Sequence, residues 1–190
     1  MQIYHRAGQS WLLIDRLRPE LARQESPFSC ERLYAKEISV LDPQSLDICD
    51  LEGDGVLELF VKVKKSTTYH PECINRPFFF NFHDDGLYAK WTGSTFGDPF
   101  QDAYFIDYFE DGRDLVFIVG LLPDGMRISA HAWQGFGFQF LGESPIYPWI
   151  GRLHKGEQGI VAELEGGSQE FILYGQGQDR SLVEWPLAEN

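Results

Sequence analysis

Three residues near the middle of the sequence have side chains that could bind a metal ion or act as a nucleophile with its base. His70 and Cys73 lie close together in His70-Pro-Glu-Cys73, and His83 follows them, with Glu72 and Asp84 as possible partners. Imidazole and thiolate groups bind zinc, and a thiol beside a histidine is a nucleophile that hydrolases use. A His-x-x-Cys pair alone is a weak pattern, and no third group is marked to orient the histidine. We therefore interpret this segment as a polar loop with one buried cysteine.

Motifs for other common chemistries do not occur in the sequence. It has no G-x-S-x-G elbow, no G-x-G-x-x-G between a strand and a helix, and no G-x-x-x-x-G-K-[ST] phosphate loop. The 29 acidic residues make chance pairs of carboxylates common, so they do not indicate a glycosidase. We predict that the chain is not an enzyme.

The charge of the chain limits the partners it can bind. With 16 Lys and Arg against 29 Asp and Glu, the formal net charge is −13. A surface of this sign repels phosphate backbones and anionic membranes, so nucleic acid is not expected as a partner. No apolar stretch approaches the ~20 residues of a spanning helix, so we expect no membrane insertion. A basic protein or a divalent cation fits this charge better, although an acidic surface can also serve solubility alone.

The cysteines and the start of the chain bear on its compartment. Cys30, Cys49 and Cys73 are widely spaced, which indicates neither a zinc site nor a dense set of disulfides. One disulfide with a free thiol and three reduced thiols are both compatible with this spacing. The first residues lack the pattern of a signal peptide. We expect a cytoplasmic location at face value, or a periplasmic or secreted one if a signal was removed.

A repeated pattern organises the sequence from residue 47 onwards. Residues 47–61, 104–118 and 149–163 each run as an apolar strand, a tight loop with glycine and a second apolar strand. The loop glycines Gly55, Gly112 and Gly156 align at offsets of 57 and 44 residues. Each unit then closes on a strand that ends in tryptophan: Trp91, Trp133 and Trp185. Repeats of about 40–50 residues that are mostly strand match propeller blades in length.

These observations predict an all-β fold, a propeller-like array of short antiparallel four-stranded blades, with a β-sandwich as the alternative. The best helix candidate, residues 18–25, spans about two turns and is too short to be stable alone. We predict a single domain of about three to four blade-like repeats, with boundaries near 1–43 (degenerate), 44–100, 101–145 and 146–190.

The sequence resembles the FG-GAP/VCBS family of β-propeller repeats over residues 44–187. The resemblance rests on the loop Asp-Leu-Glu-Gly-Asp-Gly-Val-Leu-Glu-Leu at 50–59, the apolar strand after it, and a later strand with an aromatic-Trp-x-Gly pattern. Residues 87–108 and 132–138 also look like bacterial proteins that carry such repeats. The resemblance implies blades built around these loops.

In that family the acidic loop often holds Ca²⁺, a hard cation that prefers several oxygen ligands at about 2.3–2.6 Å. The resemblance implies four ligands in this chain: Asp50, Glu52, Asp54 and Glu58. In the second loop, Phe109 and Leu115 occupy positions where the calcium-binding pattern has oxygen ligands. The third loop lacks the acidic residues of this pattern. The alternative for the first loop is a tight turn whose carboxylates accept backbone N–H bonds.

Aromatic residues crowd the middle third of the chain, and most should lie in the core. The segment 94–101 looks like a loop yet contains Phe96 and Phe100, so we predict these two residues as part of an interface. We predict a non-enzymatic interaction or scaffold domain that binds a protein partner, possibly basic, through loops of a blade-repeat fold. The alternative is a small-ligand or carbohydrate-binding module with a structural Ca²⁺ site.

Overall fold

The computed structural model describes residues 2–6, 10–14, 30–33, 41, 43–68, 70–83, 86–175 and 181–185. For residues 2–6, 10–14, 30–33, 83 and 86 only the backbone is described. The helix predicted at residues 18–25 lies outside these ranges.

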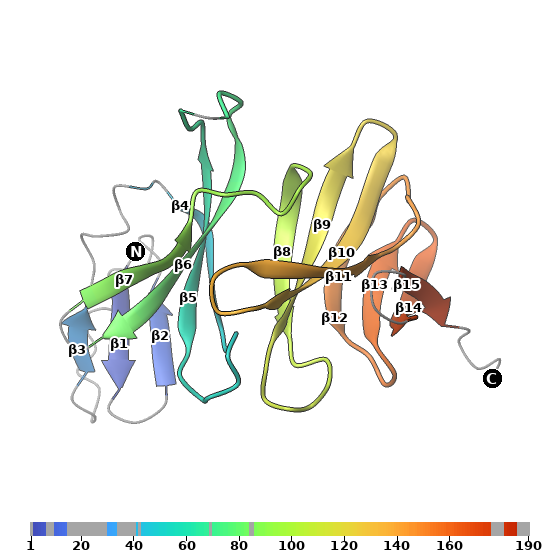
Figure 1. Ribbon diagram of the computed structural model, residues 1–190. Helices are drawn as coiled ribbons and strands as arrows, with labels where there is room; N and C mark the ends of the chain where they lie inside the picture. Colours follow the sequence, from blue (N-terminus) through green and yellow to red (C-terminus); the bar gives the residue numbers. More distant parts are fainter. Residues whose placement is uncertain are drawn as a thin grey trace.

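The described chain consists of strands in four antiparallel sheets (Figure 1). The strands are β1 (Gln2–Arg6), β2 (Ser10–Ile14), β3 (Cys30–Leu33), β4 (Pro43–Cys49), β5 (Glu58–Lys65), β6 (Ile74–His83), β7 (Gly86–Thr92), β8 (Phe100–Ile106), β9 (Leu115–Leu122), β10 (Gly125–Trp133), β11 (Phe138–Glu143), β12 (Ile150–Lys155), β13 (Ile160–Leu164), β14 (Gly167–Tyr174) and β15 (Ser181–Trp185).

Three of the sheets have four strands each, in the simple meander orders β4-β5-β6-β7, β8-β9-β10-β11 and β12-β13-β14-β15. The remaining sheet has the order β2-β1-β3. The three meanders span residues 43–92, 100–143 and 150–185. The predicted fold class, an all-β array of short antiparallel four-stranded blades, is confirmed. A sandwich description also fits these sheets.

The second strands of the first two meanders lie between two apolar layers, as their burial shows. In β9 the run from Leu115 to Gly120 is buried at every position, so both faces of the strand are covered. In β5 the run Glu58–Val61 is buried in the same way. Strands covered on both faces lose the apolar–polar alternation of a half-exposed strand. This explains the continuous apolar runs Leu-Val-Phe-Ile-Val and Leu-Phe-Val in the sequence.

The core consists of apolar layers on the faces of the meanders. One layer joins the β8–β11 sheet to the β12–β15 sheet and includes Phe117, Ile128 and Phe171. A second joins the β4–β7 sheet to the β8–β11 sheet and is rich in aromatic rings. Figure 1 shows the three sheets side by side in chain order. A blade therefore packs on its neighbour through sheet faces. Many of the loops that join its strands lie above or below the sheets in the view of Figure 1.

Inside the aromatic layer, Phe79 is fully buried and contacts rings from both sheets. Its ring centroid lies 5.2 Å from that of Phe60 and 5.2 Å from that of Phe138. Tilted and edge-on ring pairs at such distances are favourable beyond their buried area. The aromatic content that distinguishes the sequence thus joins the first two blades.

No helix in the described part of the chain is long and apolar enough to cross a membrane.

Candidate functional site

The repeat loops of the three meanders gather at one end of the molecule. They are the β4–β5 loop (residues 50–57), the β8–β9 loop (107–114) and the β12–β13 loop (156–159), at the lower end in Figure 1. We call this end the loop end. Because each loop joins the first and second strand of its meander, the blade arrangement places the sequence repeats next to one another in space.

The β4–β5 loop is a turn closed by the carboxylate of Asp50. The N–H groups of Gly53 and Asp54 donate to Asp50 Oδ1 at 2.7 and 3.3 Å, and the Gly55 N–H donates to Oδ2 at 2.8 Å. Gly53 and Gly55 have φ angles of 71° and 79°, in the left-handed region that glycine enters without strain. The Val56 N–H donates to Asp54 Oδ1 at 2.9 Å. Backbone N–H groups of the turn therefore bond to the carboxylates of both Asp50 and Asp54.

The β8–β9 loop repeats this geometry. Asp107 accepts the N–H groups of Asp111 and Gly112, each at 3.1 Å, and Asp111 accepts the N–H of Arg113 at 3.0 Å. The sequence repeat of Asp and Gly therefore corresponds to a repeated turn. It forms here although Phe109 stands at a position where the calcium-binding pattern has an oxygen.

The first two loops are also bonded to each other. The Asp50 N–H donates to Asp114 Oδ2 at 2.8 Å, and the Asp114 N–H donates to the Asp50 carbonyl at 2.7 Å. Burial raises the pKa of Asp114, while the hydrogen bond from Asp50 acts in the opposite direction. Asp114 falls one place early for the calcium pattern, and it bonds to the neighbouring loop. Sequence alignment of single units gives no sign of such a contact.

The third loop uses a carboxylate from another strand. Glu170 on β14 accepts the N–H groups of Gln158 and Gly159 with its Oε1, at 2.8 and 3.0 Å. Lys155 connects this loop to the second one, because its ammonium donates to the carbonyl oxygens of Asp107 and Tyr108. Hydrogen bonds thus link all three loops in series.

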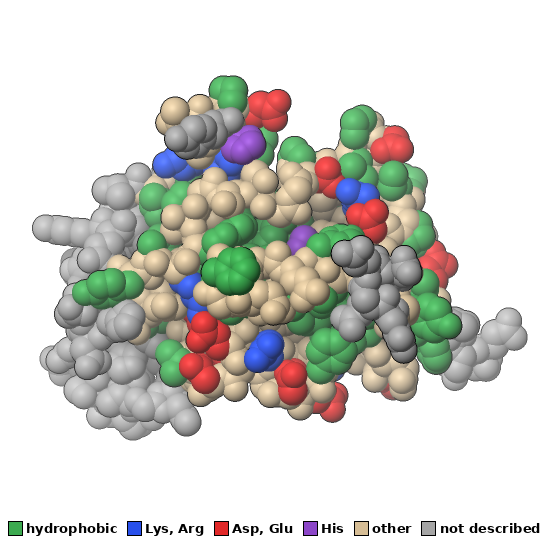
Figure 2. Space-filling view, viewed as in Figure 1, with side chains coloured by type: hydrophobic (Ala, Val, Ile, Leu, Met, Phe, Trp, Pro, Cys, Tyr) green, Lys and Arg blue, Asp and Glu red, His purple; other side chains and the backbone are tan. Residues whose placement is uncertain are grey.

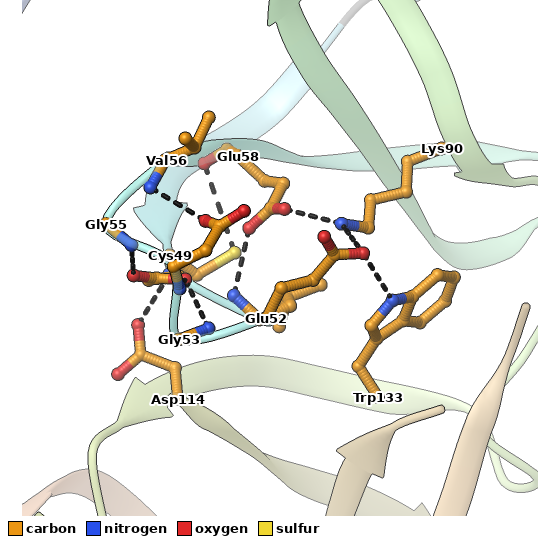
Figure 3. A network of polar contacts seen from close by, with 12 residues as sticks. Cys49, Glu52, Gly53, Gly55, Val56, Glu58, Lys90, Asp114 and Trp133 are labelled. Carbon is orange, nitrogen blue, oxygen red and sulfur yellow. Dashed lines mark hydrogen bonds and ion pairs between the residues drawn. The ribbon is translucent and has the colours of Figure 1, made fainter. Parts of the chain in front are cut away.

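A buried ion pair lies behind the first loop (Figure 3). Glu58 is 3% exposed, and its Oε2 accepts the Leu51 N–H at 2.9 Å. Lys90 Nζ lies 2.5 Å from Glu58 Oε1 and 2.9 Å from Glu52 Oε1. The indole N–H of Trp133 also donates to Glu52, at 3.2 Å. Lys90 belongs to the first blade and Trp133 to the second, so this network spans the boundary between blades.

The pKa values in this network follow from burial and pairing. Burial raises the pKa of Glu58 in spite of its hydrogen bond with Lys90. The hydrogen bond with Lys90 lowers the pKa of Glu52, which is much more exposed. Burial acts to lower the pKa of Lys90, but its bonds to the two carboxylates outweigh this and leave the pKa raised. Burial also raises the pKa of the neighbouring Cys49 thiol well above its usual value.

Each of the four residues implied as calcium ligands has a protein partner in this arrangement. Asp50 faces backbone N–H groups, and the ammonium of Lys90 bonds to both Glu52 and Glu58. In the described residues, no three His, Cys, Asp or Glu side chains form a group that could hold a metal ion. The calcium hypothesis that the resemblance implies is not tested by this arrangement.

Thermal unfolding tests the calcium hypothesis. Because the loop oxygens are already bonded, we expect the same unfolding midpoint in excess Ca²⁺ and in excess chelator. A bound ion at about 100 times its dissociation constant would instead add about 2.7 kcal/mol and raise the midpoint by a few degrees. A rise of that kind, lost in Asp54→Ala, would contradict our expectation and establish the cation site.

The two phenylalanines predicted as interface residues lie in the aromatic layer. Phe100 is 1% exposed, so its side chain belongs to the core and is not available to a partner in this conformation. Phe96 is half-buried and packs on the rings of Phe100, Trp91 and Phe138 at centroid distances of 6.1, 5.3 and 5.1 Å. Of the segment 94–101 predicted as a loop, residues 94–99 form one, whereas residues 100 and 101 begin β8. Phe96 and Phe100 both pack in the aromatic layer between two sheets.

Among the described side chains, those considered for metal or nucleophile chemistry form no metal-binding group. Cys73 and His70 are both exposed, so the prediction of a buried cysteine in this loop was wrong. The buried free cysteine is Cys49, on β4. The side chains of His83, Asp84 and Cys30 lie outside the described residues.

Two exposed apolar side chains at the loop end were missed by the sequence analysis. Val56 in the first loop and Phe109 in the second are each 56% exposed. Both occur inside the aligned Asp-Gly segments, where the calcium pattern drew attention to the acidic residues. A large hydrophobic residue inside a polar turn motif was the signal that could have identified them.

The described residues line two pockets, one at the loop end and one away from it. One, of about 480 Å³, lies at the edges of β4, β8 and β12 and is lined by residues that include Asp47, Tyr104, Asp107 and His154. The other, of about 220 Å³, lies beside the segment 96–98. Comparison with known proteins found no matching family model, no matching curated protein and no matching solved structure. Membership of the FG-GAP/VCBS family therefore stays a prediction.

Proposed function

We propose that this chain is a non-enzymatic binding module that contacts a basic protein partner through its loop end. The observation that supports this proposal most strongly is the pair of exposed side chains Val56 and Phe109. They lie on two loops that are hydrogen-bonded to each other through Asp50 and Asp114. Exposed apolar side chains on rigid loops are typical anchors of protein interfaces.

The loop that presents Phe109 is held from several sides. The Phe109 ring packs edge-on against Tyr108 at a centroid distance of 4.9 Å. The Tyr108 hydroxyl accepts the Leu173 N–H at 2.9 Å, and Lys155 holds the carbonyls at the start of the loop. A preorganised loop loses little conformational entropy on binding, which favours affinity. Next to Phe109, Glu110 has a φ of 59°, a backbone conformation uncommon outside glycine and often found at functional positions.

The charge around these side chains favours a basic partner. Residues 50–57 and 107–114 contain seven acidic residues and one basic residue, Arg113. On the face shown in Figure 2, acidic side chains occur at the lower end, where these loops lie, and also along the upper edge. Such a surface steers a positively charged protein toward it and repels an acidic one. The charge would give selectivity and association rate, and the apolar side chains would give affinity.

Affinity capture with matched variants tests this function. We expect the wild-type chain to retain a basic protein at low ionic strength and Phe109→Ser to lose it, because a hot-spot aromatic contributes about 2 kcal/mol or more. With the purified partner, this corresponds to a dissociation constant raised roughly thirtyfold. Binding should also weaken as salt increases.

The control is Trp149→Ser, which removes an aromatic residue that is 44% exposed directly before β12, at the opposite end of that strand from the third loop. It should retain the partner as the wild type does. Equal retention by the wild type and Phe109→Ser, or loss in both variants, would contradict the proposed surface.

A further inference from the structure

The smaller pocket lies between the segment 96–98 and the strands β9, β10 and β11. Its volume is about 220 Å³. The lining side chains that matter for recognition are Phe96 and Asp98 from the segment and Arg127, Ser129, Phe140 and Glu143 from the sheet. This volume is below the ~300–1,000 Å³ of sites for drug-sized molecules, so only a small molecule or a single chemical group fits.

The charged lining residues leave the pocket with an excess of negative charge. Arg127 Nη2 lies 2.6 Å from Asp98 Oδ2, and Arg127 Nη1 lies 2.7 Å from Glu143 Oε1. One guanidinium thus neutralises one of two carboxylates, and each ion pair uses one carboxylate oxygen. The side chains of Asp98 and Glu143 are 37% and 40% exposed, so solvent and ligands can reach them. A positively charged group would complete the charge balance.

Two aromatic rings line the same pocket. Phe96 and Phe140 both contact the ring of His131, at centroid distances of 5.1 and 5.8 Å. Burial lowers the pKa of His131 to about 4, so this histidine is uncharged at neutral pH and adds no positive charge. Its Nε2 lies 2.9 Å from Ser129 Oγ. A histidine with so low a pKa is a poor general base, so we interpret this pair as structural.

We propose that this pocket binds the ammonium group of a small organic cation. Phenyl faces attract cations through their quadrupole, most strongly where water is partly excluded. The excess carboxylate supplies the counter-charge, and the volume of the pocket admits an ammonium group with a few methyl or methylene groups. The site lies outside the loop end and does not depend on the function proposed for that surface.

Titration with tetramethylammonium chloride and with methylammonium chloride tests the pocket, at ionic strength held constant with sodium chloride. We expect millimolar binding, seen by NMR as saturable shifts of the backbone amides of Gly97 and Gly120, which line the pocket. Phe140→Leu and Glu143→Gln should each weaken binding roughly fivefold or more, because each removes one of the two attractions. Phe140 is 48% exposed, so we expect its replacement to leave the fold intact.

The controls are Tyr174→Leu and Glu165→Gln, which remove an exposed aromatic residue and an exposed carboxylate elsewhere and should leave binding unchanged. Nα-acetyl-lysine methylamide, which has a free ε-ammonium group, distinguishes the source of the ammonium group. Tighter binding than methylammonium would assign the pocket to a lysine side chain, and equal or weaker binding would assign it to a free cation. Absence of saturable shifts with both ammonium salts, or shifts of the same amides with sodium acetate, would overturn the proposal.

Discussion

Replacing Lys90 by methionine should destabilise the protein by about 3–5 kcal/mol at neutral pH, because it leaves the buried Glu58 carboxylate without its counter-charge. Glu58 is 3% exposed and already has a pKa raised by burial. Methionine keeps much of the length of the lysine stem, so the change removes mainly the charge and its hydrogen bonds. Urea unfolding of the wild type and of the variant measures the difference.

The pH dependence identifies the cause of this loss. A carboxyl whose pKa is higher in the folded than in the unfolded state binds more protons when folded. Stability therefore rises as pH falls from the folded-state pKa to the unfolded-state pKa. The loss of stability in Lys90→Met should therefore shrink as pH is lowered from 7 to about 4.5, which is the ordinary pKa of Glu58 in the unfolded chain. A deficit that is the same at both pH values would contradict the buried-charge explanation.

Two further variants complete the test of the ion pair. Lys90→Met combined with Glu58→Gln should recover most of the lost stability, because the introduced amide can still accept the Leu51 N–H without carrying a charge. Lys64→Met, an exposed position on the neighbouring β5, should change stability by less than about 0.5 kcal/mol.

Replacing Gly159 by alanine should cost about 3 kcal/mol or more, the upper range for forcing an extra methyl group into a packed site. A Cβ at this position would overlap the carbonyl group of Phe171, which is backbone and cannot rotate away. Phe171 is fully buried in the layer between the second and third blades, so a shift of its backbone would also disturb that layer. The Gly159 N–H bond to Glu170 would be displaced in the same way.

Gly137→Ala provides the matched control, because a Cβ there has no atom within 4 Å and the backbone has no left-handed φ. It should change the free energy of unfolding by less than about 0.5 kcal/mol. Equal effects of the two substitutions in thermal or urea unfolding would show that the contact with Phe171 does not restrict the third loop.

The candidate site divides into parts that follow from local sequence and parts that do not. The turns at Asp50 and Asp107 were predictable, because a carboxylate followed by glycine can bond N–H groups a few residues ahead. The bonds from Asp50 to Asp114 and from Gly159 to Glu170 were not, because their partners come from another loop and another strand. The ion pairs of Glu58 and Glu52 were not predictable either, because their partner Lys90 comes from β7, distant in the sequence although in the same blade.

The sequence by itself determined the all-β class and the four-stranded units, because the period of apolar residues and the positions of turn residues are local properties. Only the tertiary structure decided which side chains are available at the surface. Phe100 lies in a segment whose sequence looks like a loop, yet it begins β8 and is buried between sheets, whereas Phe109 lies in a polar turn and is exposed. The physical reason is that burial depends on the neighbouring blade, whose faces and loops reach each residue from distant parts of the chain.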